Sequence, residues 1–301
     1  MCGAFSSLAP LAKAFKDARA SPFKPLSLDL ASQMQKMTLE DAYEVQRLTY
    51  PNSSDIIGAK CGATAEKGMK AFKISEPFRA LLPSGCAIQA TSDPNAVLEI
   101  PKSKLGGSDL RGGESEWCFR LSNHAGEWDN LERTGKGGHV VDEDYVLSFV
   151  DDVFPAVEVC GSRMVQYVEN GVELTPPMKI ADGGGNGMVV LGDNRSLSGD
   201  ADISLEDKLH QLAARKIVAL VNGQVKAEGS GQDVLGHPLK SLTWLFNHFI
   251  ARGEIATMMD LKGKFVMTGT CTGMERVQLG EVFEAQFEGY EGGIKFKFID
   301  K

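Results

Sequence analysis

The chain lacks the features that would connect it to a membrane, to nucleic acid or to a disulfide framework. No apolar stretch approaches the roughly 18 residues that a membrane-spanning helix needs. No run of Lys and Arg stands out in a chain of 301 residues with a formal net charge of -8, so the electrostatic footprint of phosphate-backbone binding is missing. The six cysteines form no C-x-x-C pair and are too sparse for a disulfide framework. We therefore expect a protein with free thiols, in the cytoplasm.

Several catalytic signatures are also missing. The sequence has no G-x-S-x-G elbow, no P-loop and no G-x-G-x-x-G fingerprint. The five histidines are scattered without metal-ligand spacing. Chemistry therefore has to be sought among the carboxylates and the lysines.

The composition and the residue patterns predict an α+β protein. Hydrophobic residues make up 43% and charged residues 24%, which is typical of a globular enzyme or binding protein. Thr38 and Asp41 form a capping-box pattern before a helix, and Asn222-Gly223 predicts a type I′ hairpin. We expect one compact unit with a helical N-terminal portion at 1–95 and a β-rich portion at 96–301.

Two further segments bear on the architecture. Pro238 and Gly253 bracket an amphipathic pattern and predict a helix between them. The polar stretch 122–143 is predicted to be a surface excursion or a lid.

The segment ESEWCFRL carries the first candidate site. On a strand, alternate side chains share a face, so Glu114 and Glu116 point the same way and can converge on one cation. The plain alternative is the wet face of a half-buried strand.

A third glutamate, Glu158, supports the interpretation of this segment as part of a cation site. It lies in VFPAVEVC among apolar residues, and a buried carboxylate without a partner costs several kcal/mol. The alternative is an edge strand with Glu158 facing water. Three carboxylates without a cysteine or histidine cluster suit a hard ion such as Mg²⁺ or Mn²⁺.

Two other residues stand out. Lys60, in DIIGAKCGAT, is either an ion-pair partner or a proton donor with a lowered pKa, unless it is a surface lysine. Asp182 opens the glycine-dense KIADGGGNG, whose backbone amides could receive an anionic oxygen, although a plain tight turn is equally compatible.

Eight motifs follow one another in a particular order: DAYEVQ at 41–46, GAKCGAT at 58–64, ESE at 114–116, PAVEVCGSR at 155–163, IAD at 180–182, VNG at 221–223, LGHPLKSLTWL at 235–245 and VMTGT at 266–270. This order resembles the fumarylacetoacetate hydrolase superfamily, in particular its branch of 2-oxopent-4-enoate hydratases and 4-oxalocrotonate decarboxylases. The E-x-E element is shared widely across the superfamily. The lysine motif and the E-V-x-G-S-R element are more typical of this branch.

The resemblance implies a mixed β-roll core with a helical N-terminal portion, usually in a homo-oligomer. It implies Mg²⁺ or Mn²⁺ bound by the three glutamates, and a 2-oxo or 2-hydroxy acid chelated by that metal as the substrate. The implied metal ligands are Glu114, Glu116 and Glu158, the catalytic residues are Lys60 and Asp182, and the substrate contacts are Gly183, Gly184, Thr270 and Phe78.

The chain also departs from this branch. Where hydratases commonly have an acidic residue, it has Phe78, and where they typically read A-D-N-A-S, it has Ala181 and Asp182 followed by three glycines, 183–185. The spacing from Glu116 to Glu158, 158 − 116 = 42, is longer than expected for bacterial hydratases. These departures put ordinary dienoate hydration in doubt more than metal binding.

The leading function is a metal-dependent lyase, either hydratase or decarboxylase, that acts on a 2-oxo acid or a 2-hydroxydienoate through a metal-stabilised enolate. One alternative is an acylpyruvate-type C–C hydrolase. Hydrolases of that type generally use a His/Glu pair from an N-terminal lid, whereas the first histidine here is His124, and His124 or His139 would have to replace that base. Another alternative is a diverged member that serves as a biosynthetic tailoring enzyme or as a partner subunit of a related decarboxylase or hydratase.

Overall fold

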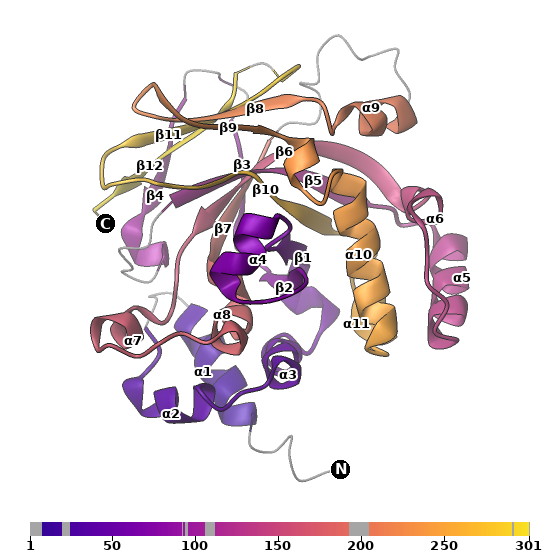
Figure 1. The fold of residues 1–301 in the computed structure, drawn as a ribbon, viewed down its shortest axis with the longest axis horizontal. Coiled ribbons are helices and arrows are strands. Elements are labelled where there is room, and N and C mark those ends of the chain that lie inside the picture. Colours follow the sequence, from indigo (N-terminus) through magenta and orange to yellow (C-terminus); the bar gives the residue numbers. More distant parts are fainter. Residues whose placement is uncertain are drawn as a thin grey trace.

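The structure, a computed structural model, describes residues 8–19, 25–91, 93, 96–105, 112–192, 205–290 and 292–300. Two β-sheets lie at its centre (Figure 1). The N-terminal helices lie on one side of these sheets, and a longer helix from the C-terminal third lies at another side.

The larger sheet has seven strands, which are β1 (Ile56–Gly62), β2 (Phe78–Pro83), β3 (Ala87–Gln89), β5 (Gly112–Leu121), β6 (Val150–Cys160), β7 (Asn186–Leu191) and β10 (Phe265–Arg276). Their order is β2-β1-β10-β5-β6-β7-β3. β1 pairs with β10 and β3 pairs with β7 in parallel, and the other neighbours are antiparallel. Strands from before and after residue 95 therefore share one sheet, and the predicted boundary between 95 and 96 stays a prediction.

The smaller sheet has five strands, which are β4 (Leu98–Pro101), β8 (Lys216–Val221), β9 (Gln224–Ser230), β11 (Val282–Phe287) and β12 (Ile294–Ile299), in the order β4-β12-β11-β8-β9. The turn between β8 and β9 has positive φ at Asn222 (52°) and Gly223 (74°), which confirms the predicted type I′ hairpin. This sheet packs on one face of the larger sheet, where the rings of Trp117 and Phe287 lie 5.2 Å apart between centroids.

Six helices gather on the N-terminal side: α1 (Ala9–Arg19), α2 (Ala31–Met34), α3 (Leu39–Thr49), α4 (Glu66–Phe72), α7 (Val165–Glu169) and α8 (Pro176–Ala181). α3 begins at the predicted capping box, in which the Asp41 amide donates to the Thr38 hydroxyl at 3.1 Å and the Thr38 amide donates to the Asp41 carboxylate at 2.8 Å. These helices enclose their own apolar core, which includes Phe15, Tyr43 and Phe78.

The remaining helices are α5 (Ala125–Lys136), α6 (Glu143–Leu147), α9 (Leu205–Gln211), α10 (Pro238–Ala251) and α11 (Ile255–Met259). α10 begins at the predicted Pro238, and Gly253 follows its end with φ of 66°. The stretch predicted to be a surface excursion or a lid lies at the surface, and most of it is helix α5, whose inner face is packed against the protein. Trp128 and Leu131, three residues apart on one face of α5, are fully buried, and Asn247 of α10 exchanges two 2.8 Å hydrogen bonds with the Val141 backbone.

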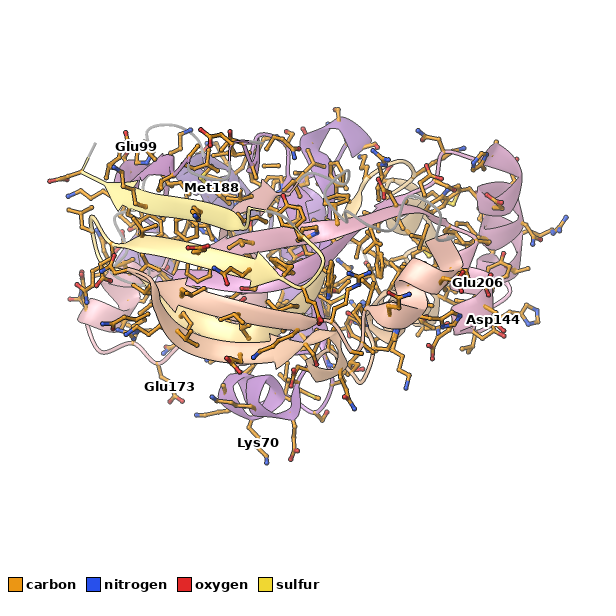
Figure 2. All side chains as sticks on the ribbon, turned by 90° about the horizontal axis from the view of Figure 1, so that it is seen from above. Lys70, Glu99, Asp144, Glu173, Met188 and Glu206 are labelled. Atoms are coloured by element: carbon orange, nitrogen blue, oxygen red, sulfur yellow. The ribbon has the colours of Figure 1, made fainter. Side chains whose placement is uncertain are left out.

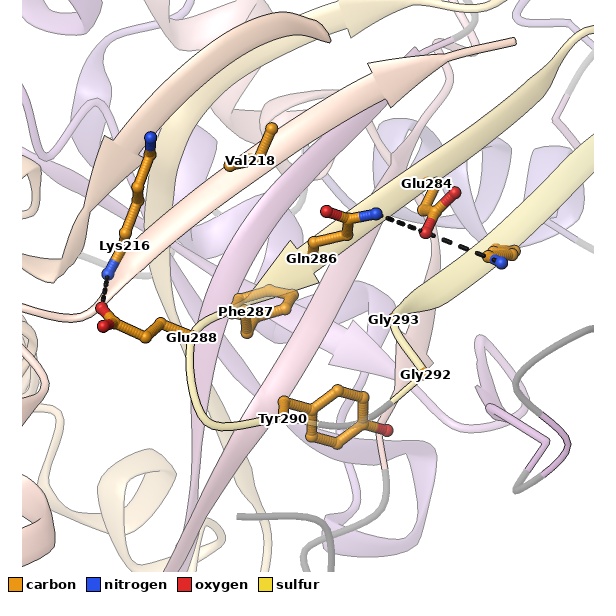
Figure 3. A pocket seen from close by; sticks show the side chains of 10 residues that line it. Lys216, Val218, Glu284, Gln286, Phe287, Glu288, Tyr290, Gly292 and Gly293 are labelled. Atoms are coloured by element: carbon orange, nitrogen blue, oxygen red, sulfur yellow. Dashed lines mark hydrogen bonds and ion pairs between the residues drawn. The ribbon is translucent and has the colours of Figure 1, made fainter. Parts of the chain in front are cut away.

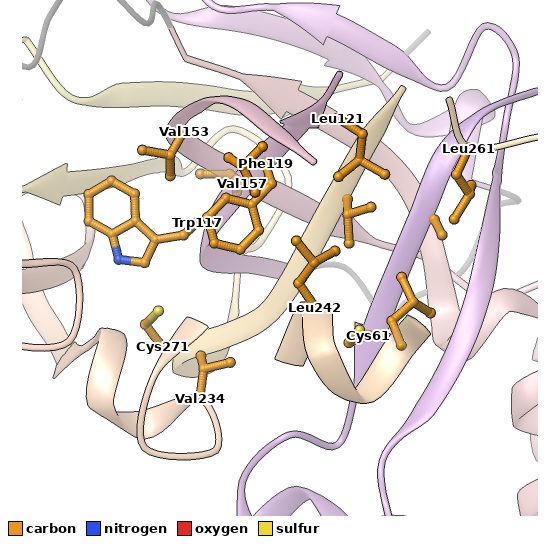
Figure 4. Close-up of a cluster of buried hydrophobic side chains, with 14 of the residues drawn as sticks. Cys61, Trp117, Phe119, Leu121, Val153, Val157, Val234, Leu242, Leu261 and Cys271 are labelled. Carbon is orange, nitrogen blue, oxygen red and sulfur yellow. The ribbon is translucent and has the colours of Figure 1, made fainter. Parts of the chain in front are cut away.

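The main apolar core lies on the face of β5 that carries Trp117, Phe119 and Leu121 (Figure 4). Leu242 of α10 packs into the same cluster. By contrast, Lys70 and Glu173 project from the periphery (Figure 2), and their side chains are 74% and 77% exposed. The alternation predicted for β5 therefore sends its apolar side chains to this core and its glutamates to the opposite face.

The predicted fold class, α+β with a mixed β-roll core, is confirmed by the two curled mixed sheets and their helical cover. Among the described residues, no helix is both long and apolar enough to cross a membrane.

Candidate metal centre

Three glutamates from two adjacent strands converge on the face of the larger sheet opposite the main core. Glu114 and Glu116 lie two residues apart on β5, and Glu158 lies on β6 directly across from Glu114 in the antiparallel register. Each offers one carboxylate oxygen, and these oxygens lie within 4.8 Å of one another. The strand period of two places Glu114 and Glu116 on one face, and the register between β5 and β6 places Glu158 beside them.

The glutamates are withdrawn from water. Glu116 and Glu158 are each 1% exposed, and Glu114 is partly buried. β6 lies in the interior of the sheet, so the alternatives of a wet strand face and of an edge strand are wrong. A buried carboxylate needs a compensating charge, and three of them in contact need more than one.

Lys60 on β1 supplies a single positive charge. Its side chain is 3% exposed, and Nζ lies 2.7 Å from Oε1 and 2.6 Å from Oε2 of Glu158. Burial alone would lower the pKa of Lys60, but the charges of Glu158, Glu114 and Glu116 outweigh it and raise that pKa. Of the alternatives left open for this lysine, the structure shows the buried ion pair.

One lysine against three glutamates leaves a formal charge of -2. This excess negative charge raises the pKa values of two glutamates. Burial, followed by the charge of Glu158, raises the pKa of Glu114 to about 7. Burial, followed by the charges of Glu158 and Glu114, raises the pKa of Glu116. Three oxygen donors with an excess charge of two fit a hard divalent cation. Neither zinc nor a soft metal would be preferred by this donor set.

Strand β10 supports Glu116 from the other side. The Gly269 amide donates to Glu116 Oε2 at 2.9 Å. Thr270 lies opposite Glu116 in the register, and its hydroxyl accepts from the Gly273 amide at 2.9 Å. The hydroxyl of Thr64 next to Gly269 is buried and has no hydrogen-bond partner among the described residues.

Asp182 does not join the carboxylate cluster. Its Oδ1 accepts from Arg163 Nε at 2.5 Å, and its Oδ2 accepts from the Ser162 hydroxyl at 3.1 Å and from the Arg163 amide at 3.2 Å. Both members of this ion pair are 1% exposed. Asp182 therefore fixes the start of the glycine loop, and its catalytic role stays a prediction.

Phe78 lies beside Lys60, and two glycines make room for it. Its ring centroid is 5.8 Å from Lys60 Nζ, and the side chain is 1% exposed. A Cβ added at Gly184 would lie 2.5 Å from the ring, and one added at Gly62 would also overlap it. The two departures from the hydratase pattern, Phe78 and the glycine loop, are therefore sterically coupled.

Two polar residues of the site were not predicted. Arg163 donates through Nη1 to the Asn186 carbonyl at 2.5 Å and through Nη2 to the Asp182 carbonyl. Asn186 Nδ2 donates to Glu158 Oε1 at 3.0 Å. Arg163 stands inside the quoted E-V-x-G-S-R element, which was a usable signal, whereas an asparagine after three glycines looks like an ordinary turn residue.

A concavity of about 560 Å³ lies on the smaller sheet between β8 and the turn that joins β11 to β12 (Figure 3). Its charged side chains pair locally: the Lys216 amide donates to Glu288 at 2.9 Å, and Lys295 lies 3.6 Å from Glu284. It holds no carboxylate cluster among the described residues. It is therefore separate from the candidate metal centre.

Sequence comparison finds similar curated relatives, among them a decarboxylase and a hydratase. The chain is 26% identical over 274 residues to a 4-oxalocrotonate decarboxylase from Pseudomonas putida, covering 88% of this chain and 87% of the relative. It is 25% identical over 280 residues to a 2-keto-4-pentenoate hydratase from Paraburkholderia xenovorans, covering 91% and 89%. The resemblance predicted from the sequence is confirmed: the chain is similar to curated decarboxylases and hydratases of this kind. No protein-family profile matches the chain.

Solved structures of similar enzymes share the fold. A 4-oxalocrotonate decarboxylase from Pseudomonas putida G7, complexed with magnesium and adipate, superposes with a TM-score of 0.72 over 98% of both chains at 24% identity. A fumarylpyruvate hydrolase from Pseudomonas aeruginosa, in complex with Mn²⁺ and pyruvate, gives a TM-score of 0.52 at 13% identity over 81% of this chain and 89% of that one.

The predictions of an enzyme, of a lyase of the hydratase or decarboxylase type and of a divalent-metal cofactor agree with these relatives. The agreement with the cofactor has a second, independent basis in the geometry, because the glutamates predicted as ligands are the ones that converge.

Proposed function

We propose that the chain is a divalent-metal-dependent lyase that acts on a 2-oxo acid or its 2-hydroxydienoate tautomer. The observation that carries this proposal is the buried cluster of three glutamates and one lysine with a formal charge of -2. Such a cluster is expensive to bury unless a dication completes it. The relatives, a decarboxylase and a hydratase, support the reaction class.

Glu114, Glu116 and Glu158 would hold Mg²⁺ or Mn²⁺. When bound, such an ion supplies a Lewis acid for the carboxylate and the adjacent oxygen of a 2-oxo acid and stabilises the negative charge of an enolate. Hydration and decarboxylation share that requirement.

Lys60 would be the residue that donates a proton to the substrate. Its ion pair with Glu158 keeps the ammonium charged, so Nζ can stabilise negative charge next to the bound acid. A dication on the same glutamates would offset the charges that raise the pKa of Lys60, which would let Nζ donate a proton there. Phe78 covers this ammonium with an aromatic ring and would keep water from that side of it. Lys60 is thus proposed as the catalytic acid, with Phe78 as a substrate contact.

Asp182 would hold the glycine loop at 183–185 in place. Through Arg163 it orders residues 182–186, and the amides of Gly183 and Gly184 are then available for an anionic oxygen of the substrate. Thr270, opposite Glu116, would complete the substrate contacts.

Cleavage of a C–C bond by water is less well supported. None of the five histidines belongs to the carboxylate cluster. The side chain of His124 is 74% exposed and follows the end of β5, roughly 16 Å along the strand from Glu116, and His139 is also exposed. A histidine that would activate water therefore has no support among the residues considered for that role.

We also propose a cytoplasmic enzyme, in agreement with five free buried cysteines. Assembly into a homo-oligomer, or with a related decarboxylase or hydratase, belongs to the proposal and rests on the family resemblance alone.

The test is proton–deuterium exchange at C3 of 2-oxopentanoate, followed by NMR with Mg²⁺ and again with EDTA. Exchange that requires the metal would show that the site forms an enolate. Stoichiometric metal without exchange would contradict the proposed reaction and favour a diverged binding or partner role. Turnover of 2-oxopent-4-enoate and of 4-oxalocrotonate would then separate hydration from decarboxylation.

A further inference from the structure

The glycine loop beside the metal centre contributes no side chain until its last position. Gly183, Gly184 and Gly185 all have positive φ, at 71°, 65° and 81°, a conformation that side chains rarely adopt. Asn186 follows at the start of β7 with 0% exposure. Its position is fixed because its carbonyl accepts from Arg163 Nη1 at 2.5 Å.

We infer that Asn186 is a positioning residue that leaves Glu158 one free lone pair and thereby sets a preference of the carboxylate cluster for a small divalent cation over a large one. The inference rests on the proposed metal site. It adds the choice among metals, which the three glutamates do not determine by themselves.

The hydrogen bonds to Glu158 carry the argument. A carboxylate offers about four lone-pair positions. Oε1 accepts from Lys60 Nζ at 2.7 Å and from Asn186 Nδ2 at 3.0 Å, and Oε2 accepts from Lys60 Nζ at 2.6 Å. The orientation of the Asn186 amide follows because an ionised carboxylate only accepts. One lone pair, on Oε2, remains.

A carboxylate with one free lone pair serves a cation as a one-oxygen donor. Mg²⁺ is small, demands near-octahedral ligands and retains water, whereas Ca²⁺ is larger and readily takes both oxygens of one carboxylate. Without Asn186, Oε1 of Glu158 would regain a lone pair and the carboxylate could present both oxygens. Asn186 therefore disfavours the larger ion in particular.

The other half of the amide supports the same role. Asn186 Oδ1 is buried and has no hydrogen-bond partner among the described residues. A buried acceptor without a partner is costly and rare. Oδ1 is thus available for a donor that arrives with the bound ion, and a hydrated Mg²⁺ brings such donors more readily than a largely dehydrated Ca²⁺.

The test is isothermal titration calorimetry of the full chain with Mg²⁺ alone and with Ca²⁺ alone. In Asn186→Ala we expect Mg²⁺ affinity to fall about 10- to 100-fold, as for other residues that orient a metal ligand. Ca²⁺ affinity should fall less, so the Ca²⁺ to Mg²⁺ affinity ratio should rise, by up to about the factor that Mg²⁺ affinity loses. Asn186→Leu nearly keeps the shape but loses the donor without adding a charge, and should shift the ratio the same way if the alanine variant fails to fold.

Asn247→Ala is the matched control, because this asparagine also makes two side-chain hydrogen bonds but lies between α10 and Val141. It should leave the ratio unchanged. An unchanged ratio in a folded Asn186 variant that still binds both ions would overturn this inference alone. Absence of any divalent binding by the unaltered chain would overturn the proposed function and this inference with it.

Discussion

Strands β1 and β2 carry one charge cluster on each face, around the buried Lys60 on one face and the buried Arg79 on the other, and the two clusters differ in their net charge. Lys60 lies across from Ala80, whereas its neighbour Cys61 lies across from Arg79, so Lys60 and Arg79 point to opposite faces. The Lys60 face holds three glutamates and carries a formal charge of -2. The Arg79 face is neutral.

The Arg79 cluster consists of alternating charges and aromatic rings. Arg79 pairs with Glu254, Glu254 pairs with Arg252 at 2.7 Å, and Arg252 pairs with Glu40. The Arg79 guanidinium also lies 4.6 Å from the ring centroid of Tyr43 and 4.4 Å from that of Phe249. Two arginines and two glutamates cancel, and the rings cover the cationic faces.

The comparison separates structural from functional burial of charge. A neutral, ion-paired cluster joins α3, β2 and α10 without an added charge, although Nε and Nη1 of Arg79 are buried with no hydrogen-bond partner among the described residues. A cluster with excess negative charge is stable only when a proton or a cation is added. The raised pKa values of Glu114 and Glu116 show that these glutamates bind a proton more tightly than usual. The excess charge, more than burial itself, therefore indicates a binding site.

The largest expected effect comes from removing one carboxylate of the unbalanced cluster. Glu116→Ala should abolish stoichiometric Mg²⁺ or Mn²⁺ binding and, with it, deuterium exchange at the 2-oxo acid. Metal content after dialysis measures this. Glu254→Gln, which removes a carboxylate from the neutral cluster, should retain the metal. Equal metal content in wild type and Glu116→Ala would show that the site is elsewhere.

Removing the lysine should separate binding from chemistry. In Lys60→Met the three glutamates remain, so the metal should stay bound, while exchange should slow about 10²- to 10⁴-fold, as for loss of a general acid. Calorimetry and NMR exchange rates on the same sample distinguish the two. Wild-type exchange in this variant would exclude Lys60 from the mechanism.

Removing the buried cation of the neutral cluster should affect stability alone. In Arg79→Met, Glu254 loses one partner but keeps Arg252, so we expect a loss of about 2–3 kcal/mol in the free energy of unfolding, below the cost of leaving a fully buried charge unpaired. Urea denaturation measures it. Metal affinity should not change, and a large change in metal affinity would mean that the two faces are coupled.

Much of the fold followed from local patterns in the sequence. The period of two in ESEWCFRL placed Glu114 and Glu116 on one face, and Pro238 marked the start of α10. Glu158 was recognisable because its apolar neighbours require a compensated charge. These features depend on short-range sterics and burial, which single segments express.

The rest depends on long-range pairing. That Glu158 lies opposite Glu114 follows from a register interrupted near Leu121, which no segment reveals by itself. The Arg79 cluster joins residues up to 212 positions apart, so its members look like ordinary charged residues in the sequence. Phe78 and Gly184 were each seen as departures, but only packing shows that the ring needs the missing side chain.

The smallest expected effect concerns His248, which adjoins the neutral cluster. Burial, followed by the charges of Arg79 and Arg252, lowers its pKa to about 3. Between pH 6.5 and 3 the unfolded chain binds a proton at this histidine and the folded chain does not, so this contribution to stability is lost as the pH falls. Lowering the pH from 7.5 to 5 should cost about 1–2 kcal/mol through His248.

His248→Phe should remove that part of the pH dependence, while replacement of the exposed His139 should not. Urea denaturation of all three proteins at both pH values measures the difference. An identical pH dependence in wild type and His248→Phe would mean that the folded cluster accepts the proton. The neutral cluster would then be able to take up charge as the carboxylate cluster does, and balance alone would no longer distinguish the two faces.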